Sequence, residues 1–144
     1  MSGDGGVYRE LLLEHFRHPR NRGEVASMLR VRRGANPRCG DEVEVGIDLD
    51  GERLRAVRFR GRGCSICIAS ASMMSEALDG ATVDEALSLC ADMNGWFAAA
   101  ADTRPPPRIY GPLTALSAVQ GHPARRRCAL LAWDALAEAL RDEP

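Results

Sequence analysis

The sequence contains no lysine, because all 19 of its basic residues are arginine. Without a lysine amine the chain cannot form the internal aldimine of a pyridoxal-phosphate enzyme. It also cannot complete a Walker phosphate loop, whose motif ends in Gly-Lys-Ser/Thr. These two classes of enzyme are therefore excluded.

The sequence also has no excess of charge and no long apolar run. The formal net charge is −1 and the isoelectric point is about 6.3, so there is no overall positive field to attract nucleic acid or an acidic membrane. No run reaches the roughly eighteen apolar residues of a membrane span, and the opening MSGDGG lacks the basic and apolar regions of a signal peptide. We expect a cytoplasmic protein with neither a nucleic-acid nor a membrane partner.

The chain has 144 residues, of which 45% are hydrophobic. This is the size of one ordinary domain, with enough apolar surface for a continuous core. We therefore expect a single domain over residues 1–144.

Hydrophobic periodicity predicts a small antiparallel sheet between helices. Residues 42–48 and 54–59 alternate as strands around an Asp50–Gly51 hairpin signal, with a bulge expected near Ala56. A weaker extended stretch at 28–33 and a loop at 34–42 precede them. Helices are predicted at residues 7–18, 65–78, 82–93, 113–119 and 123–141. The fold class is therefore α+β, with a sheet packed on several helices.

Five cysteines are many for a small cytosolic chain, where reducing conditions disfavour structural disulfides. Three lie where the backbone favours chemistry: Cys39 in a Gly/Pro loop, Cys64 directly before a helix, and Cys128 in the early turns of another. Asp41 would project to the same side as Cys39 if the backbone between them is extended. Three thiolates and a carboxylate suit tetrahedral zinc or an iron–sulfur cluster. The spacing alone leaves open a shared metal site or thiols scattered through a core.

Three blocks of sequence carry a resemblance to a known family. "NPRCGDEVEV", "GRGCSICIASASMM" and "PARRRCALLAW" occur in the order and separation typical of the iron–sulfur scaffold family that includes IscU, SufU and the N-terminal domain of NifU. With "VYRELLLEHFRHPRNRG", the match runs from Val7 to Trp133. IscU-type members have a histidine directly before the last cysteine, where this chain has Arg127. The chain is most similar to the SufU branch.

The resemblance implies a fold, a metal site and a partner. The fold would be IscU/SufU-like, with a three-stranded antiparallel sheet. Zinc would be held by Cys39, Asp41, Cys64 and Cys128, and Arg125 would correspond to an arginine beside the site. Cys39 would take persulfide sulfur from a SufS-type cysteine desulfurase, which lends a histidine to the zinc, and downstream iron–sulfur proteins would receive it.

Two other functions stay open. The same residues would serve a scaffold that assembles a transient [2Fe–2S] cluster. Alternatively, Cys64 and Cys67 form a CxxC dithiol, although the βαβ context of thioredoxin-like oxidoreductases is missing. Family members usually have serine at position 67, and we expect Cys67 to be a small buried helix residue.

The remaining candidates are assigned structural roles. Cys90 lies on the apolar side of its predicted helix, so a place in the core is expected. His122, six residues before Cys128, is expected to be solvated, and His15 and His18 are assigned to the N-terminal helix. The segment "DTRPPPRIYGPLTAL" differs from SufU relatives, so the contact with a desulfurase would differ there.

Overall fold

The computed structural model describes residues 4–38 and 40–141 of the chain. Its elements are α1 (Asp4–Arg17), β1 (Arg30–Asn36), β2 (Asp41–Asp50), β3 (Arg53–Arg62), α2 (Ser65–Ala77), α3 (Val83–Ala98), a 3-10 helix η1 (Gly111–Leu116), α4 (Ser117–Gln120) and α5 (Pro123–Arg141). This order of a helix, a small sheet and several helices confirms the predicted α+β class.

The sheet is antiparallel with the order β1-β2-β3, so β2 lies in the middle. A two-residue turn at Gly51 and Glu52, with Gly51 at φ 63, joins β2 to β3 at the predicted hairpin. The register shifts after Asp48, where Asp48 pairs with Ala56 and Leu49 with Leu54. The predicted bulge is thus confirmed, and it keeps Leu54, Val57 and Phe59 all on the buried face.

β1 begins two residues later and ends three residues later than the extended stretch predicted from sequence. The prediction assigned Gly34 and Ala35 to a loop because the glycine, asparagine and proline of segment 34–42 are typical of loops. Pairing with β2 overrides that tendency, since Gly34 lies opposite Val43 and Asn36 opposite Asp41. The longer β1 therefore pairs with β2 as far as Asp41, the first residue of β2.

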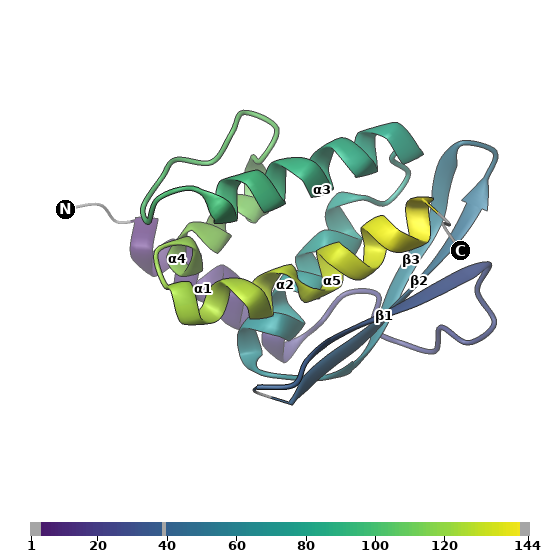
Figure 1. Ribbon diagram of the computed structural model, residues 1–144, viewed down its shortest axis with the longest axis horizontal. Helices are drawn as coiled ribbons and strands as arrows, with labels where there is room; N and C mark the ends of the chain where they lie inside the picture. Colours follow the sequence, from purple (N-terminus) through teal and green to yellow (C-terminus); the bar gives the residue numbers. More distant parts are fainter. Residues whose placement is uncertain (1–3, 39, 142–144) are drawn as a thin grey trace.

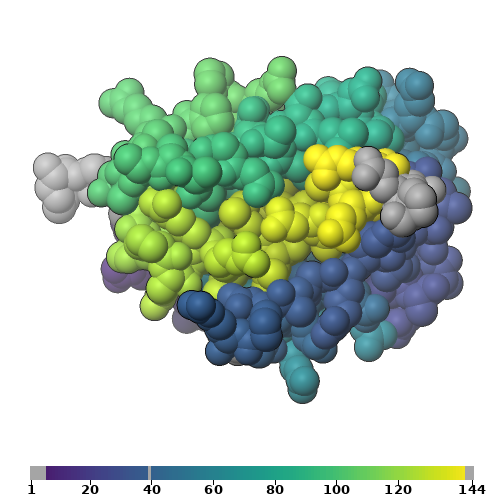
Figure 2. Space-filling model, in the orientation of Figure 1, coloured from purple at the N-terminus to yellow at the C-terminus, as the bar shows by residue number. Residues whose placement is uncertain are grey.

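The helices cover one face of the sheet (Figure 1). α5 packs on β1 and β2 and also contacts α2 and α3, while α1 packs on α2. Figure 2 shows α5 as a band at the surface between the α3 region and β1. A methyl group at Gly34 would lie 2.9 Å from the Leu131 carbonyl oxygen, so the absence of a side chain lets α5 approach β1 closely.

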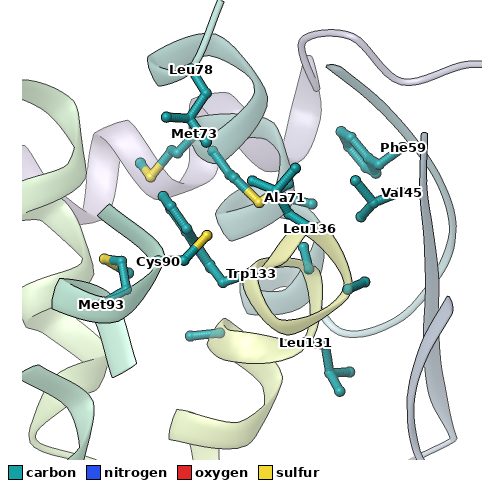
Figure 3. Packing of buried hydrophobic residues seen from close by; sticks show 14 of the residues in the cluster. Val45, Phe59, Ala71, Met73, Leu78, Cys90, Met93, Leu131, Trp133 and Leu136 are labelled. Atoms are coloured by element: carbon teal, nitrogen blue, oxygen red, sulfur yellow. The ribbon is translucent and has the colours of Figure 1, made fainter. Parts of the chain in front are cut away.

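The core lies between the sheet and the helices α2, α3 and α5 (Figure 3). Trp133 of α5 is fully buried, and its indole Nε1–H donates a 3.0 Å hydrogen bond to Ser70 Oγ of α2. The Ser70 hydroxyl in turn donates to the Ala129 carbonyl at 2.6 Å. These two bonds hold α5 at a fixed position on α2 in an apolar setting where unpaired polar groups would be costly.

Candidate metal centre

Cys64 lies at the junction between β3 and α2. β3 ends at Arg62, Gly63 follows, and Cys64 is the N-cap of α2 with extended dihedral angles of φ −65 and ψ 167. Its side chain is exposed and makes no capping hydrogen bond, so the sulfur is available at the surface. An N-cap position offers the unpaired amides and the partial positive charge that favour a negatively charged ligand.

Asp41 reaches the same place from the start of β2. The β2–β3 register sets Glu42 opposite Arg62, so the first residue of β2 lies beside the last residues before α2. Asp41 Oδ1 accepts a 3.1 Å hydrogen bond from the main-chain N–H of Cys64, and the residue is only 4% exposed. Sequence reasoning treated Asp41 only as a ligand, whereas the structure also gives its carboxylate the task of capping α2.

Cys128 completes the group from α5. It is 7% exposed and lies in the second turn of that helix. One ligand atom from each of Asp41, Cys64 and Cys128 lies within 4.8 Å of the other two. Three residues that are far apart in the sequence therefore form one cluster.

The donor set fits a zinc ion. Zinc takes thiolate ligands at about 2.3 Å and carboxylate oxygens at about 2.0–2.2 Å in a tetrahedral arrangement, in which two sulfurs lie about 3.8 Å apart. Separations of up to 4.8 Å are therefore closed by small side-chain rotations. The same thiolates also suit iron.

Cys39 lies outside the described residues. The prediction that it shares a side with Asp41 required an extended backbone, but Gly40 between them has φ 75. A left-handed residue reverses the local chain direction, so the alternation argument does not apply here. The assignment of Cys39 as a ligand and sulfur acceptor remains a proposal.

The three arginines before Cys128 differ in their surroundings. Arg125 and Arg127 are exposed, whereas Arg126 is half-buried and its Nε–H donates a 2.7 Å hydrogen bond to the Gln120 carbonyl. Among these three arginines, Arg126 is therefore the one that points inward. A role for Arg125 beside the site remains a proposal.

The other two cysteines are buried, as expected. Cys67 is 0% exposed, one helical turn beyond Cys64. Cys90 lies beside Trp133 in the core (Figure 3), and burial raises the pKa of its thiol to about 12. Cys90 is therefore an inert core thiol at neutral pH.

The histidines do not join the cluster formed by the described residues. His122 is exposed, as predicted, and His18 is exposed after the end of α1. His15 is buried, and its Nδ1 lies 2.7 Å from Ser72 Oγ, so it ties α1 to α2.

Gly63 has a role that sequence reasoning missed. A methyl group at this position would lie 3.1 Å from Asp41 Cγ, and also 3.1 Å from both Cβ and Sγ of Cys67. The absence of a side chain lets the β3–α2 junction lie against the Asp41 carboxylate. The available signal was the pair of glycines in "GRGC", which precedes the cysteine.

The cluster is separate from a groove that the described residues form elsewhere on the molecule. That groove, of about 920 Å³, lies between the C-terminal end of α2, the start of α3 and η1, and none of the three ligands lines it. The metal centre thus lies outside that groove, which has the size of an organic-ligand pocket.

The fold and the cluster define a small α+β protein in which two thiols and a carboxylate that could hold a metal ion meet where a β-hairpin joins two helices. The family model of the NifU-like N-terminal domain matches residues 7–143, so the chain belongs to this family. Helices among the described residues are all too short or too polar to cross a membrane.

Comparisons with known proteins agree with this membership. The chain is 34% identical to the zinc-dependent sulfurtransferase SufU of Bacillus subtilis, covering 95% of this chain and 91% of that protein. It is 32% identical to the iron–sulfur cluster assembly scaffold protein IscU of Streptococcus pyogenes, covering 94% and 83%. A crystal structure of a candidate SUF-system scaffold protein from Fervidobacterium islandicum superposes with a TM-score of 0.83 at 30% identity, covering 96% and 99%.

Proposed function

We propose that this protein is a zinc-dependent sulfur acceptor that takes persulfide sulfur from a SufS-type cysteine desulfurase and passes it on for iron–sulfur cluster assembly. The observation that carries the proposal is the cluster of Asp41, Cys64 and Cys128, whose ligand atoms lie within 4.8 Å of one another. The similarity to a SufU protein along 95% of the chain supports the same activity.

Zinc bound by these residues, with Cys39 as a fourth ligand, would keep the thiols deprotonated at neutral pH. The sulfur acceptor in this proposal is Cys39, which follows Arg38 in the sequence. Its thiolate attacks the outer sulfur of the desulfurase persulfide. The sulfur–sulfur bond of the persulfide breaks, the cysteine thiolate of the desulfurase leaves, and a new sulfur–sulfur bond forms on Cys39. The exchange needs no external oxidant or reductant.

The other residues hold the site in place. Asp41 fixes the beginning of α2 through the Cys64 N–H, and α5 carries Cys128 on a helix held to α2 by Ser70. Arg125 is exposed near the start of α5, and we assign it the role of attracting the anionic persulfide. We place this activity in the cytoplasm, where reducing conditions keep the thiols from forming structural disulfides.

Turnover of a cysteine desulfurase with and without the protein tests the proposal. We expect the wild-type protein to stimulate turnover, and Cys39→Ala and Asp41→Ala to lose the stimulation. Cys90→Ala is the matched control, because Cys90 is a buried core thiol that does not belong to the group of Asp41, Cys64 and Cys128. Stimulation that survives in Cys39→Ala would contradict the assignment of the acceptor.

A second candidate is a scaffold on which a [2Fe–2S] cluster is built and handed over. The specific support is the soft donor set, together with relatives that are named as scaffold proteins. Anaerobic reconstitution with iron, cysteine and a desulfurase separates the two functions. A cluster that forms on the protein with visible absorption and moves to an apo-ferredoxin supports the scaffold, whereas labelled sulfur on Cys39 without a cluster supports the carrier.

A further inference from the structure

Cys64 and Cys67 form a pair with opposite exposure in the first turn of α2. Cys64 is exposed, whereas Cys67 is 0% exposed. The helical turn from Cys64 to Ile68 is hydrogen-bonded, because the Ile68 N–H donates a 3.2 Å hydrogen bond to the Cys64 carbonyl. An oxidant in solution therefore reaches the first sulfur, and the second sulfur is reachable only from within the protein.

The backbone spacing of this pair suits a disulfide. Helical geometry places α-carbons three residues apart at about 5 Å, from a rise of about 1.5 Å per residue and a radius of about 2.3 Å. Disulfides join α-carbons that are about 4.4–6.8 Å apart. The two sulfurs can thus be joined by side-chain rotation alone.

Cys67 also borders the metal centre. The position of a methyl group on Gly63 would lie 3.1 Å from Cys67 Sγ and 3.1 Å from Asp41 Cγ, so both side chains face the same small volume. Cys67 nevertheless does not belong to the group of described donors whose atoms all lie within 4.8 Å of one another. Cys67 therefore lies next to the proposed ligands and is not one of them.

We propose that Cys64 and Cys67 form a reversible disulfide when peroxide oxidises the site, and that Cys67 thereby protects the ligand Cys64 from irreversible oxidation. The consequence for zinc rests on the proposed function, because it requires Cys64 to be a ligand. The disulfide itself requires only the pair of thiols.

The chemistry balances with hydrogen peroxide as the oxidant. The Cys64 thiolate attacks one peroxide oxygen, the oxygen–oxygen bond breaks, and Cys64 becomes a sulfenic acid with release of hydroxide. The Cys67 sulfur then attacks the Cys64 sulfur, the sulfur–oxygen bond breaks, and water leaves once the thiol proton is transferred. Two thiols and one peroxide give one disulfide and two waters.

Among the described residues, Cys128 is the competing partner, because its sulfur also lies within 4.8 Å of Cys64. A disulfide bond is only about 2.05 Å long, so that pairing must draw two elements together. α5 is held to α2 by the hydrogen bonds of Ser70 with Ala129 and Trp133. Pairing within one helical turn needs no such movement, so we expect Cys67 to react first.

To test the proposal, the zinc-loaded full-length protein is treated with hydrogen peroxide, and the remaining thiols are blocked with iodoacetamide. The protein is then digested with trypsin and a glutamate-specific protease. Cleavage after Arg62 and Glu76 gives peptide 63–76, which contains Cys64 and Cys67 and no other cysteine. We expect this peptide to be unalkylated and lighter by two hydrogens. Oxidation of Met73 or Met74 would add oxygen instead and is distinguishable by mass.

Zinc binding is measured in parallel with a chromogenic chelator, before oxidation, after it, and after dithiothreitol. Wild type is expected to lose its zinc and recover it after reduction. Cys67→Ser is expected to lose zinc without recovery, because its Cys64 proceeds to the sulfinic acid. Cys67→Ala serves as a second variant if serine disturbs the buried position, and Cys90→Ala should recover like the wild type.

Three results would overturn the proposal: peptide 63–76 alkylated at both cysteines after peroxide, a Cys64–Cys128 disulfide as the main product, or equal recovery of zinc by Cys67→Ser and wild type. A purified chain that binds no zinc would instead contradict the proposed function. Peptide 63–76 would then still decide whether the disulfide forms.

Discussion

The main-chain N–H of Cys64 donates a 3.1 Å hydrogen bond to Oδ1 of Asp41. This bond joins the first residue of β2 to the N-cap of α2, and both residues belong to the cluster. One carboxylate thus serves the helix and the proposed metal. The two tasks can be separated by substitution.

Asp41→Asn keeps an oxygen that can accept from the Cys64 N–H but removes the negative charge, whereas Asp41→Ala removes both. We expect both variants to bind zinc at least about tenfold more weakly, measured by competition with a chelator. Only Asp41→Ala should also lower the free energy of unfolding of the metal-free protein, by about 2 kcal/mol, because it leaves the Cys64 N–H without its acceptor. Asp50→Ala, at the exposed end of the same strand, is the control and should change neither quantity. Equal stability of the Asn and Ala variants would contradict the capping role.

Gly63→Ala should weaken zinc binding without touching any ligand. Its methyl group would lie 3.1 Å from Asp41 Cγ and from Cys67 Sγ, which is tighter than ordinary van der Waals contact, so the carboxylate must shift. The matched control is Gly23→Ala, where a methyl group would meet no atom within 4 Å. Isothermal titration with zinc compares the two, and an unchanged affinity for Gly63→Ala would show that the junction is not tightly packed.

His15 should make the stability of the fold depend on pH. Burial lowers the pKa of its imidazole below the ordinary value of 6.5, and the Arg20 guanidinium lowers it further. The unfolded chain therefore takes up a proton as the pH falls through about 6.5, while the folded chain does not until lower pH. The free energy of unfolding therefore has the full His15 contribution above about pH 6.5, and it decreases as the pH falls below that value.

Urea unfolding at pH 7.5 and pH 5.5 measures this contribution. Wild type should lose more stability between the two pH values than His15→Gln, which lacks the titrating group but retains polar atoms near Ser72. The difference between the two proteins removes the pH dependence that metal ligands add to both. An equal loss in the two proteins would show that His15 does not contribute.

Cys90 should resist alkylation in the folded protein. Burial raises the pKa of its thiol to about 12, so almost none is thiolate at pH 8. We expect iodoacetamide to modify Cys64 in the metal-free protein within minutes, and Cys90 only after addition of urea. Peptide mapping distinguishes the two, because cleavage after Glu76 places them in different peptides.

Much of the fold could be predicted because its signals are local. The alternation of Val43, Val45 and Ile47 and the turn at Gly51 specify a hairpin, and Pro123 marks the start of the last helix. The first strand was predicted less well because its glycine and asparagine are typical of loops, and contacts with β2 and α5 override that tendency.

The family resemblance named four candidate ligands, and the structure brings three of them, Asp41, Cys64 and Cys128, together. Three features could not be predicted: the second task of Asp41, the close packing at Gly63 and the inward position of Arg126. Each depends on how separate elements meet, which spacing along one chain does not describe.

By itself, the sequence determined the chemical types at the site and the elements that carry them, because residue identity and short-range periodicity are local properties. The tertiary structure decided that the start of β2, the N-terminus of α2 and the second turn of α5 meet at one point. That meeting follows from the β2–β3 register and from the packing of α5 on α2, and both are interactions between residues distant in the chain.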